Sequence, residues 1–245
     1  GISSQGPVLF HGYDPPPGGK WSDDVIPGKL GAFDRASGEE CWMVPCEVGY
    51  GRGFAVGFGA RGQVLVLGPS AHGHRVVRMS VETGEILDEA AIPVFDQASF
   101  STERVICCSP VRIFALDPNG LNETWSYSRE GERYHQCVPL DGRVLVIFST
   151  RGGGQGLLAF NAKNGEFLEV MIPPLLPVVH GLVATGGVAV LLTESLDKVL
   201  EGEAASDLMR SVALHHSAGI RDTLSLIAMS STGSSMSQPE WIQVL

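Results

Sequence analysis

A strand–turn–strand segment occurs four times along the chain, and this repeat constrains the fold more than any other feature of the sequence. In each copy a polar residue opens a short turn, a glycine closes it, and apolar residues lie on both sides. The four copies are residues 31–42, 77–88, 114–125 and 158–169. Their turn glycines are Gly38, Gly84, Gly120 and Gly165, at separations of 46, 36 and 45 residues. Because glycine adopts positive φ without steric cost, the repeat predicts four β-hairpins.

The residues that open these turns are short and polar, so their side chains can bond to nearby backbone amides. They are Asp34, Ser80, Asp117 and Asn161. A second hairpin lies between successive copies, and its later strand is an unbroken apolar run. The runs are residues 64–67, 105–108, 144–148 and 188–192. Such runs are typical of strands that are covered on both faces. Four strands in about 42 residues, repeated along the chain, predict a β-propeller.

The chain has 245 residues, which at this period predicts one all-β domain, 1–245, with five or six four-stranded blades. We place the blades at 7–48, 49–93, 94–130, 131–175 and 176–217, with 218–245 left over. The first blade is short of an inner strand. We expect a strand near the C-terminus to complete it or to form a sixth blade with it, because closure removes an open sheet edge. Apolar spacing within 196–210 predicts a short helical insertion.

The segment Leu30–Trp42 resembles the outer hairpin of quinoprotein-like (PQQ-like) propeller repeats, with a strand, a turn ending in glycine and a strand carrying tryptophan. Residues 114–125 are similar and end in Trp125, whereas the other two copies keep the turn and lack the tryptophan. The resemblance covers residues 7–193 and implies blade architecture rather than an activity. A PQQ cofactor is not expected, since 245 residues are too few for the eight-bladed ring of the quinoprotein dehydrogenases.

Acidic residues outnumber basic ones by 27 to 17, for a formal net charge of −10. No block of basic residues is present, so neither nucleic acid nor an anionic membrane surface is an expected partner. The five cysteines include no pair with the spacing of a zinc ribbon. In a reducing compartment they would be small buried apolar residues.

No positively charged region followed by an apolar core is visible, so we expect no signal peptide in this chain. The stretch Val170–Thr193 contains no charged residue but three prolines and several glycines. These would break a membrane-spanning helix, so we predict no membrane span there and instead two strands joined at residues 185–187. The sequence does not assign the protein to a compartment.

Polar residues on the first strands of the blades are the candidate site, because these strands usually line the central channel of a propeller. The candidates are His11, Arg52, Asp96, Gln97, His135, Gln136 and His180. Histidine is the commonest nitrogen ligand of metals, so His11, His135 and His180 are the candidate ligands of a divalent metal. The simpler interpretation is a water-filled channel with a polar lining.

Two glycine-rich segments are similar to nucleotide-binding loops. Residues 57–62 match GxGxxG, but a strand follows where a dinucleotide site needs a helix, so dinucleotide binding is rejected. Residues 151–156 lack the lysine of a P-loop. They are interpreted as a flexible loop between two strands and as a candidate binding rim.

The sequence therefore favours a non-catalytic propeller module that binds a partner protein or a small ligand through its loops and channel mouth. The alternative is a metal-dependent enzyme, a lactonase-like hydrolase or an oxidoreductase, with His135, His180, Asp96 and His11 on the axis. Fold alone does not decide between them.

Overall fold

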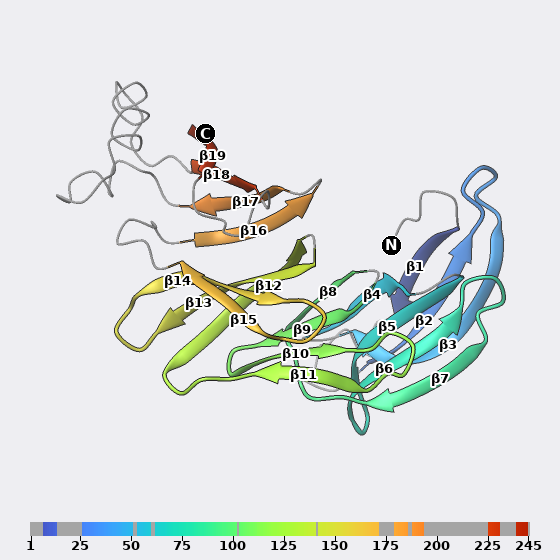
Figure 1. The fold of residues 1–245 in the computed structure, drawn as a ribbon. Helices are drawn as coiled ribbons and strands as arrows, with labels where there is room; N and C mark the ends of the chain where they lie inside the picture. The colour runs from blue at the N-terminus through green and yellow to red at the C-terminus, as the bar shows by residue number, and fades with distance from the viewer. Residues whose placement is uncertain are drawn as a thin grey trace, which may run out of the picture. The chain divides into compact units, whose positions relative to one another are not determined.

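The computed structural model describes residues 7–13, 26–50, 53–59, 62–101, 103–140, 142–171, 179–185, 188–193, 225–230 and 239–244. All regular structure in these residues is β-strand, in four four-stranded antiparallel sheets and one three-stranded sheet (Figure 1). The all-β prediction is confirmed for this part of the chain. The helical insertion predicted at 196–210 lies outside the described residues.

The chain divides into two compact units, of which unit 1 comprises residues 1–109 and 113–126. Its first sheet contains β1 (Val8–Tyr13), β2 (Ile26–Phe33) and β3 (Glu40–Tyr50). The second contains β4 (Ala55–Phe58), β5 (Gln63–Ser70), β6 (Gly73–Ser80) and β7 (Ile86–Ala91). The third contains β8 (Gln97–Phe100), β9 (Val105–Ser109), β10 (Arg112–Leu116) and β11 (Glu123–Tyr127), of which Arg112 and Tyr127 belong to unit 2.

Unit 2 comprises residues 110–112 and 127–245 and holds the other two sheets. One contains β12 (Glu132–Leu140), β13 (Arg143–Thr150), β14 (Gln155–Asn161) and β15 (Phe167–Met171). The other contains β16 (Val179–Thr185), β17 (Val188–Thr193), β18 (Ser225–Ser230) and β19 (Pro239–Val244). The two strands predicted within 170–193 are β16 and β17, which pair as a hairpin. No helix in the described residues is long and apolar enough to cross a membrane.

The expected pairing of a C-terminal strand with the first sheet is wrong. Instead, β18 pairs with β17, and β19 pairs with β18, so the last two strands complete the sheet that β16 begins. The physical reason is that β17 would otherwise present an unpaired backbone edge, and the apolar run of β18 covers it. The first sheet does have three strands in the described residues, in agreement with the missing strand that the sequence indicated.

The repeated turns form as the sequence predicts. The Asp34 carboxylate accepts hydrogen bonds from the backbone amides of Ala36 and Ser37, at 2.9 and 2.8 Å, and the other turn-opening side chains bond similarly. Gly38, Gly84 and Gly165 have φ of 74°, 74° and 72°.

The third turn differs from the prediction, which made Gly120 its residue of positive φ. Its positive φ, 54°, belongs to Leu121 and not to Gly120. The Leu121 amide donates to the Asp117 carbonyl at 2.8 Å, as the Gly38 amide does to the Asp34 carbonyl at 2.9 Å. Leu121 therefore holds the place that glycine holds in the other turns. Its side chain is buried in the core, and that packing compensates for the less favourable backbone.

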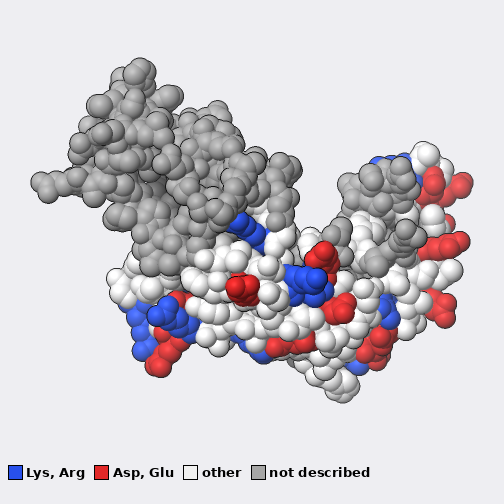
Figure 2. All heavy atoms as spheres, viewed as in Figure 1, with Lys and Arg blue, Asp and Glu red and all other residues white. Residues whose placement is uncertain are grey.

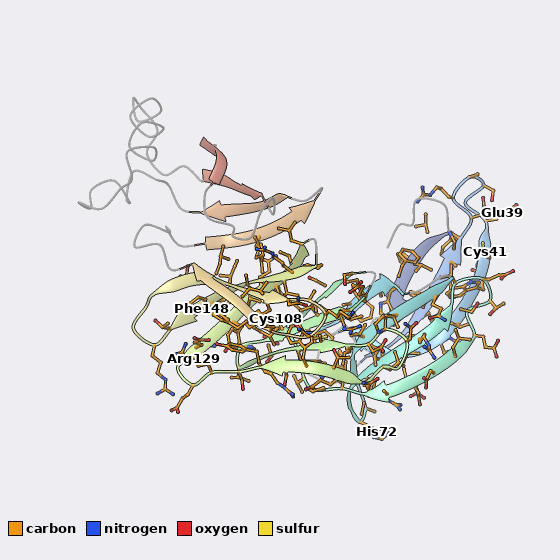
Figure 3. All side chains as sticks on the ribbon, viewed as in Figure 1. Glu39, Cys41, His72, Cys108, Arg129 and Phe148 are labelled. Carbon is orange, nitrogen blue, oxygen red and sulfur yellow. The ribbon has the colours of Figure 1, made fainter. Side chains whose placement is uncertain are left out.

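The core of unit 1 lies on both faces of β5, which explains the unbroken apolar run. Val64 and Val66 belong to a cluster with residues of the first sheet, such as Leu30. Leu65 and Leu67 belong to a second cluster that includes residues of β9 and β10. All four β5 residues are fully buried, so the prediction that this strand is covered on both faces is confirmed. Figure 3 shows Cys108 and Phe148 among the strands and His72 at the turn after β5.

Candidate functional site

His11, a predicted channel residue, lies in β1 with its ring against Phe54, at a centroid distance of 4.2 Å. Its Nε2 atom is buried and accepts or donates no hydrogen bond within the described part of the chain. Burial lowers the pKa of His11, and a hydrogen bond with the Val48 backbone partly opposes this. The imidazole is therefore neutral at pH 7.

Three other predicted channel residues belong to the same unit. Asp96 directly precedes β8, and its backbone amide donates to the Cys108 carbonyl at 2.8 Å. Gln97 begins β8 and is exposed. Arg52 lies outside the described residues.

The two remaining histidine candidates lie at equivalent bulges of neighbouring strands in unit 2. The β12–β13 register shifts between Tyr134 and Gln136, so that His135 is the extra residue. The β16–β17 register shifts in the same way around His180. The His135 Nε2 lies 2.7 Å from the Ser149 hydroxyl. Burial, together with the positive charge of Arg133, lowers the pKa of His135.

Gln136, predicted to line the channel, forms hydrogen bonds that connect two strands. Its Nε2 donates to the Leu182 carbonyl at 2.7 Å, and the Leu182 amide donates to its Oε1 at 3.0 Å. Both ends of the side-chain amide therefore join β12 to β16. No group of three His, Cys, Asp or Glu side chains able to hold a metal ion occurs in the described residues. The axial metal site stays a prediction.

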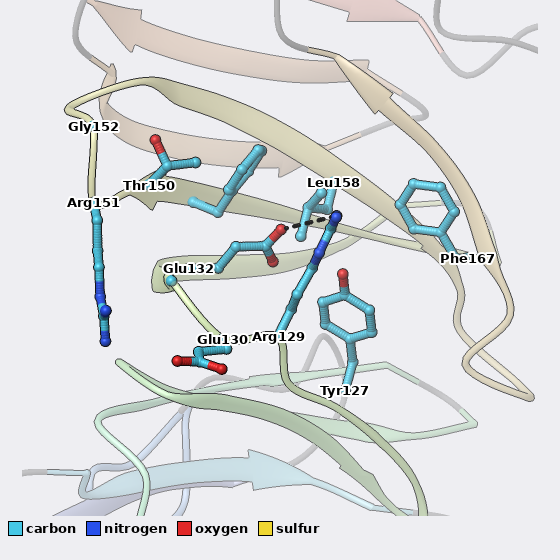
Figure 4. A pocket seen from close by; sticks show the side chains of 11 residues that line it. Tyr127, Arg129, Glu130, Glu132, Thr150, Arg151, Gly152, Leu158 and Phe167 are labelled. Atoms are coloured by element: carbon cyan, nitrogen blue, oxygen red, sulfur yellow. Dashed lines mark hydrogen bonds and ion pairs between the residues drawn. The ribbon is translucent and has the colours of Figure 1, made fainter.

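A pocket of which the sequence indicated only part of the rim lies in unit 2, where β11 ends and β12 begins (Figure 4). We call it the Arg129 pocket; its volume is about 540 Å³. It is lined by Tyr127, Arg129, Glu130, Gly131, Glu132, Phe148, Thr150, Arg151, Gly152, Leu158 and Phe167. The strands of one sheet provide its floor, and two loops provide its rim.

The floor of the Arg129 pocket is apolar. Phe148 and Leu158 are buried there, whereas Phe167 is 47% exposed. The centroid of the Phe160 ring lies 4.8 Å from that of Tyr127 and 5.9 Å from that of Phe167. An exposed aromatic ring supported by a packed cluster is a rigid contact surface, because little side-chain entropy remains to be lost on binding.

One side of the pocket carries a buried carboxylate. The Glu132 side chain is 8% exposed and lies 3.5 Å from the Arg129 guanidinium, which is 72% exposed. Figure 4 shows this guanidinium directed at Glu132, with Arg151 on the far side of Glu132 from Phe167. The Tyr134 hydroxyl donates to Glu132 at 3.0 Å and accepts from the Arg129 amide at 2.9 Å. Burial and the bond to Glu132 raise the pKa of Tyr134, so it remains a donor.

Backbone hydrogen bonds hold the two loops of the rim together. The Arg151 amide donates to the Gly131 carbonyl at 3.0 Å, which joins the loop before β12 to the loop after β13. The second loop closes on itself, because the Thr150 amide donates to the Gly154 carbonyl at 2.8 Å. The glycine-rich segment 151–156, interpreted as a candidate rim, thus contributes Arg151 and Gly152 to the pocket.

The repeat builds an equivalent groove in unit 1. Val44 follows Trp42 by two residues, as Tyr127 follows Trp125, and Ile86 follows the turn glycine as Phe167 does. Val44, Val77 and Ile86 line a groove of about 700 Å³, and Ile86 is 50% exposed. This periodicity is the signal by which the apolar residues of both grooves could have been found in the sequence. Arg129 and Glu132 lie outside the repeat and carried no such signal.

A comparison with protein-family models finds no match, and none of the curated proteins matches the chain. Among solved structures, the crystal structure of BamB from Moraxella catarrhalis is similar to this chain. The two are 14% identical, with a TM-score of 0.43, over 91% of this chain and 74% of that one.

Proposed function

We propose that the protein is a non-catalytic module that binds an extended segment of a partner protein, and that the segment docks in the Arg129 pocket. The observation that carries this is a half-exposed Phe167 on a packed aromatic floor, beside a polar rim that hydrogen bonds already hold in place. Large apolar side chains exposed beside polar groups mark interaction sites.

The openness of the rim favours a protein segment over a small molecule. Small-molecule sites bury most of their ligand in an enclosed cavity. Here Arg129 is 72% exposed, Phe167 is nearly half exposed, and Arg151 and Gly152 are exposed as well. Such a surface can accept one apolar side chain while the rest of the bound segment runs across the rim.

The rim is held in shape before a ligand arrives. The Tyr134 hydroxyl fixes the Arg129 amide, and the Arg151 amide fixes the neighbouring loop to Gly131. Because these loops are already ordered, a bound segment loses less free energy to loop ordering.

We also propose that the five sheets are blades of a propeller. The sheets of four strands follow one another along the chain, and β5 carries apolar residues on both faces, as a blade between two others requires. A small-angle X-ray scattering curve that fits a compact ring would support this, and one that requires two separated bodies would contradict it.

The metal-dependent enzyme is not the function we favour. Both ends of the Gln136 side-chain amide form hydrogen bonds with the Leu182 backbone, and the His135 ring forms one with the Ser149 hydroxyl. These contacts give two of the candidate channel residues a structural explanation.

The test is selection of peptides from a displayed random library by the wild-type protein, followed by titration of the selected peptides against two variants. Phe167→Ser removes the exposed ring from the pocket. Leu168→Ser is the matched control, because Leu168 is 40% exposed on the same strand and does not line the pocket.

We expect the selected peptides to lose at least about tenfold in affinity with Phe167→Ser, as for a buried aromatic anchor, and to keep it with Leu168→Ser. Amide hydrogen exchange should slow on binding at residues 129–133 and 150–154. Equal binding to both variants, or protection confined to other strands, would show that this pocket is not the docking site.

A further inference from the structure

A second hollow adjoins the Arg129 pocket, because the loop that forms the rim of that pocket lines both. We call it the Arg133 hollow; its volume is about 620 Å³. It shares Arg129, Glu130, Gly131, Glu132 and Arg151 with the Arg129 pocket and adds Pro110, Val111, Ser128 and Arg133. Val111 is 70% exposed, so the hollow has an apolar margin of its own.

The strand register places its arginines together. Arg133 pairs with Ser149 across β12 and β13, and Glu132 pairs with Thr150. Arg151 follows Thr150 directly. Arg133 in β12 and Arg151 directly after β13 therefore lie at one end of the same sheet, next to the loop that carries Arg129.

The charges around the hollow are not balanced within the protein. Arg129 is engaged by Glu132 at 3.5 Å. Within the ranges that the structure describes, neither Arg133 nor Arg151 forms an ion pair, and both are exposed. In a chain with 27 acidic and 17 basic residues, two such arginines at one hollow are unexpected. Figure 2 shows acidic and basic side chains interspersed over the face that it draws.

We infer that the segment bound in the Arg129 pocket carries a carboxylate next to its apolar residue, and that Arg133 and Arg151 hold this carboxylate. The inference rests on the proposed function, since it names the chemistry of the partner at the same site. The guanidinium fork suits a carboxylate, which it can bind through two parallel hydrogen bonds. The partner is thus a protein segment in which an aromatic or aliphatic residue adjoins aspartate or glutamate.

A polyanion fits the hollow less well than a single carboxylate. Glu130 and Glu132 line the same hollow, and the chain has a formal net charge of −10. Both would repel a run of phosphates, whose binding needs many clustered basic residues. One or two carboxylates on a segment anchored by an apolar side chain avoid most of this repulsion.

The test uses three fluorescein-labelled peptides, GSFDESG, GSFNQSG and GSADESG, in fluorescence anisotropy titrations at low and moderate salt. The first should bind best, and salt should weaken it more than the second. Arg133→Gln and Arg151→Gln should each weaken GSFDESG about three- to fivefold, as for an exposed ion pair, and leave GSFNQSG unchanged.

Lys163→Gln is the charge-matched control. Lys163 lies in the turn after β14, whereas Arg151 lies in the loop before β14, at the opposite end of that strand. The Lys163→Gln variant should bind all three peptides with the affinity of the wild type. Arg133→Lys, which keeps the charge and loses the fork, should recover part of the affinity lost in Arg133→Gln. Thermal unfolding of each variant verifies that it is folded.

The outcomes separate the two proposals. If GSFDESG and GSFNQSG bind equally, and only Phe167→Ser weakens them, the carboxylate inference is overturned and the docking site stands. If no peptide binds in a way that depends on Phe167, the proposed function itself fails. Binding of GSADESG as tight as that of GSFDESG would show an anion site without an apolar anchor, which also contradicts the inference.

Discussion

The side chain of Gln136 and the backbone of Leu182, 46 residues apart, exchange two hydrogen bonds of 2.7 and 3.0 Å. Gln136→Leu would leave the Leu182 amide and carbonyl without these partners. We expect it to lower the free energy of unfolding by about 1–3 kcal/mol, the cost of unmet buried hydrogen bonds. Urea denaturation measures this.

The control for Gln136 is Gln97→Leu, since Gln97 is an exposed glutamine on the first strand of another sheet. It should change stability by less than about 0.5 kcal/mol, as exposed substitutions do. If Gln136→Leu left stability unchanged and abolished ligand binding, Gln136 would be a channel residue after all.

The turn glycines are not equivalent, although the repeat makes them look so. A Cβ on Gly84 would lie 2.6 Å from the Trp42 ring, whose Nε1 donates to the Val81 carbonyl at 2.8 Å. A Cβ on Gly38 would meet nothing within 4 Å, and both residues have φ of 74°. Gly38→Ala should therefore cost about 1–2 kcal/mol from its backbone alone.

Gly84→Ala should cost about 1–3 kcal/mol more than Gly38→Ala, because it adds a steric clash to the same backbone strain. Urea denaturation measures the unfolding free energy of both variants, and the difference between their losses is the cost of the clash with Trp42. Equal losses of stability would mean that the tryptophan ring moves aside freely.

The Tyr134 hydroxyl should be needed for the order of the Arg129 loop. Tyr134→Phe removes the acceptor of the Arg129 amide and a donor to the buried Glu132 carboxylate. We expect a loss of about 1–2 kcal/mol in unfolding free energy and faster hydrogen exchange at the Arg129 amide. Exchange at Val144, in the middle of the same sheet, serves as the internal reference. An unchanged exchange rate at the Arg129 amide would show that the Tyr134 hydroxyl does not order this loop.

His11 should make the protein less stable as the pH falls. Its pKa in the folded state lies below the usual 6.5, so the unfolded state takes up the proton first. The contribution of neutral His11 to the free energy of unfolding is fully present above pH 6.5. It is lost as the pH falls through and below that value. His11→Phe, which keeps a ring next to Phe54, should make unfolding free energy less dependent on pH between 7 and 5.5.

His72→Phe is the comparison for His11, because His72 lies exposed at the turn after β5 (Figure 3). The same slope for both variants and the wild type would mean that His11 does not titrate differently on folding.

Thiol reactivity should single out Cys41. It is exposed, whereas Cys46, Cys107, Cys108 and Cys137 are buried, and none of the five forms a disulfide. Burial raises the pKa of Cys46 and of Cys107, which further suppresses their thiolates. Ellman's reagent on the folded protein should therefore label one thiol rapidly, and Cys41→Ser should remove that phase. Several rapid thiols would show that the buried strands open readily.

Much of the local structure could be predicted from short stretches of the sequence. Asp34 bonds its own turn, Gly38 and Gly84 take positive φ, and the apolar run 64–67 is buried on both faces. Each of these follows from a few neighbouring residues and from the alternation of side chains along a strand. The third turn shows the limit, because Leu121 replaces glycine where burial of its side chain offsets an unfavourable φ.

The sequence by itself determined that this chain forms repeated four-stranded β-sheets with tight polar turns, since period and turn chemistry are local properties. Only the tertiary structure decided which strands meet and which polar groups remain available. It paired β18 with β17, committed Gln136 to Leu182, and left Arg133 and Arg151 without carboxylate partners among the described residues. These results depend on residues far apart in the chain, whose mutual distances no local pattern specifies.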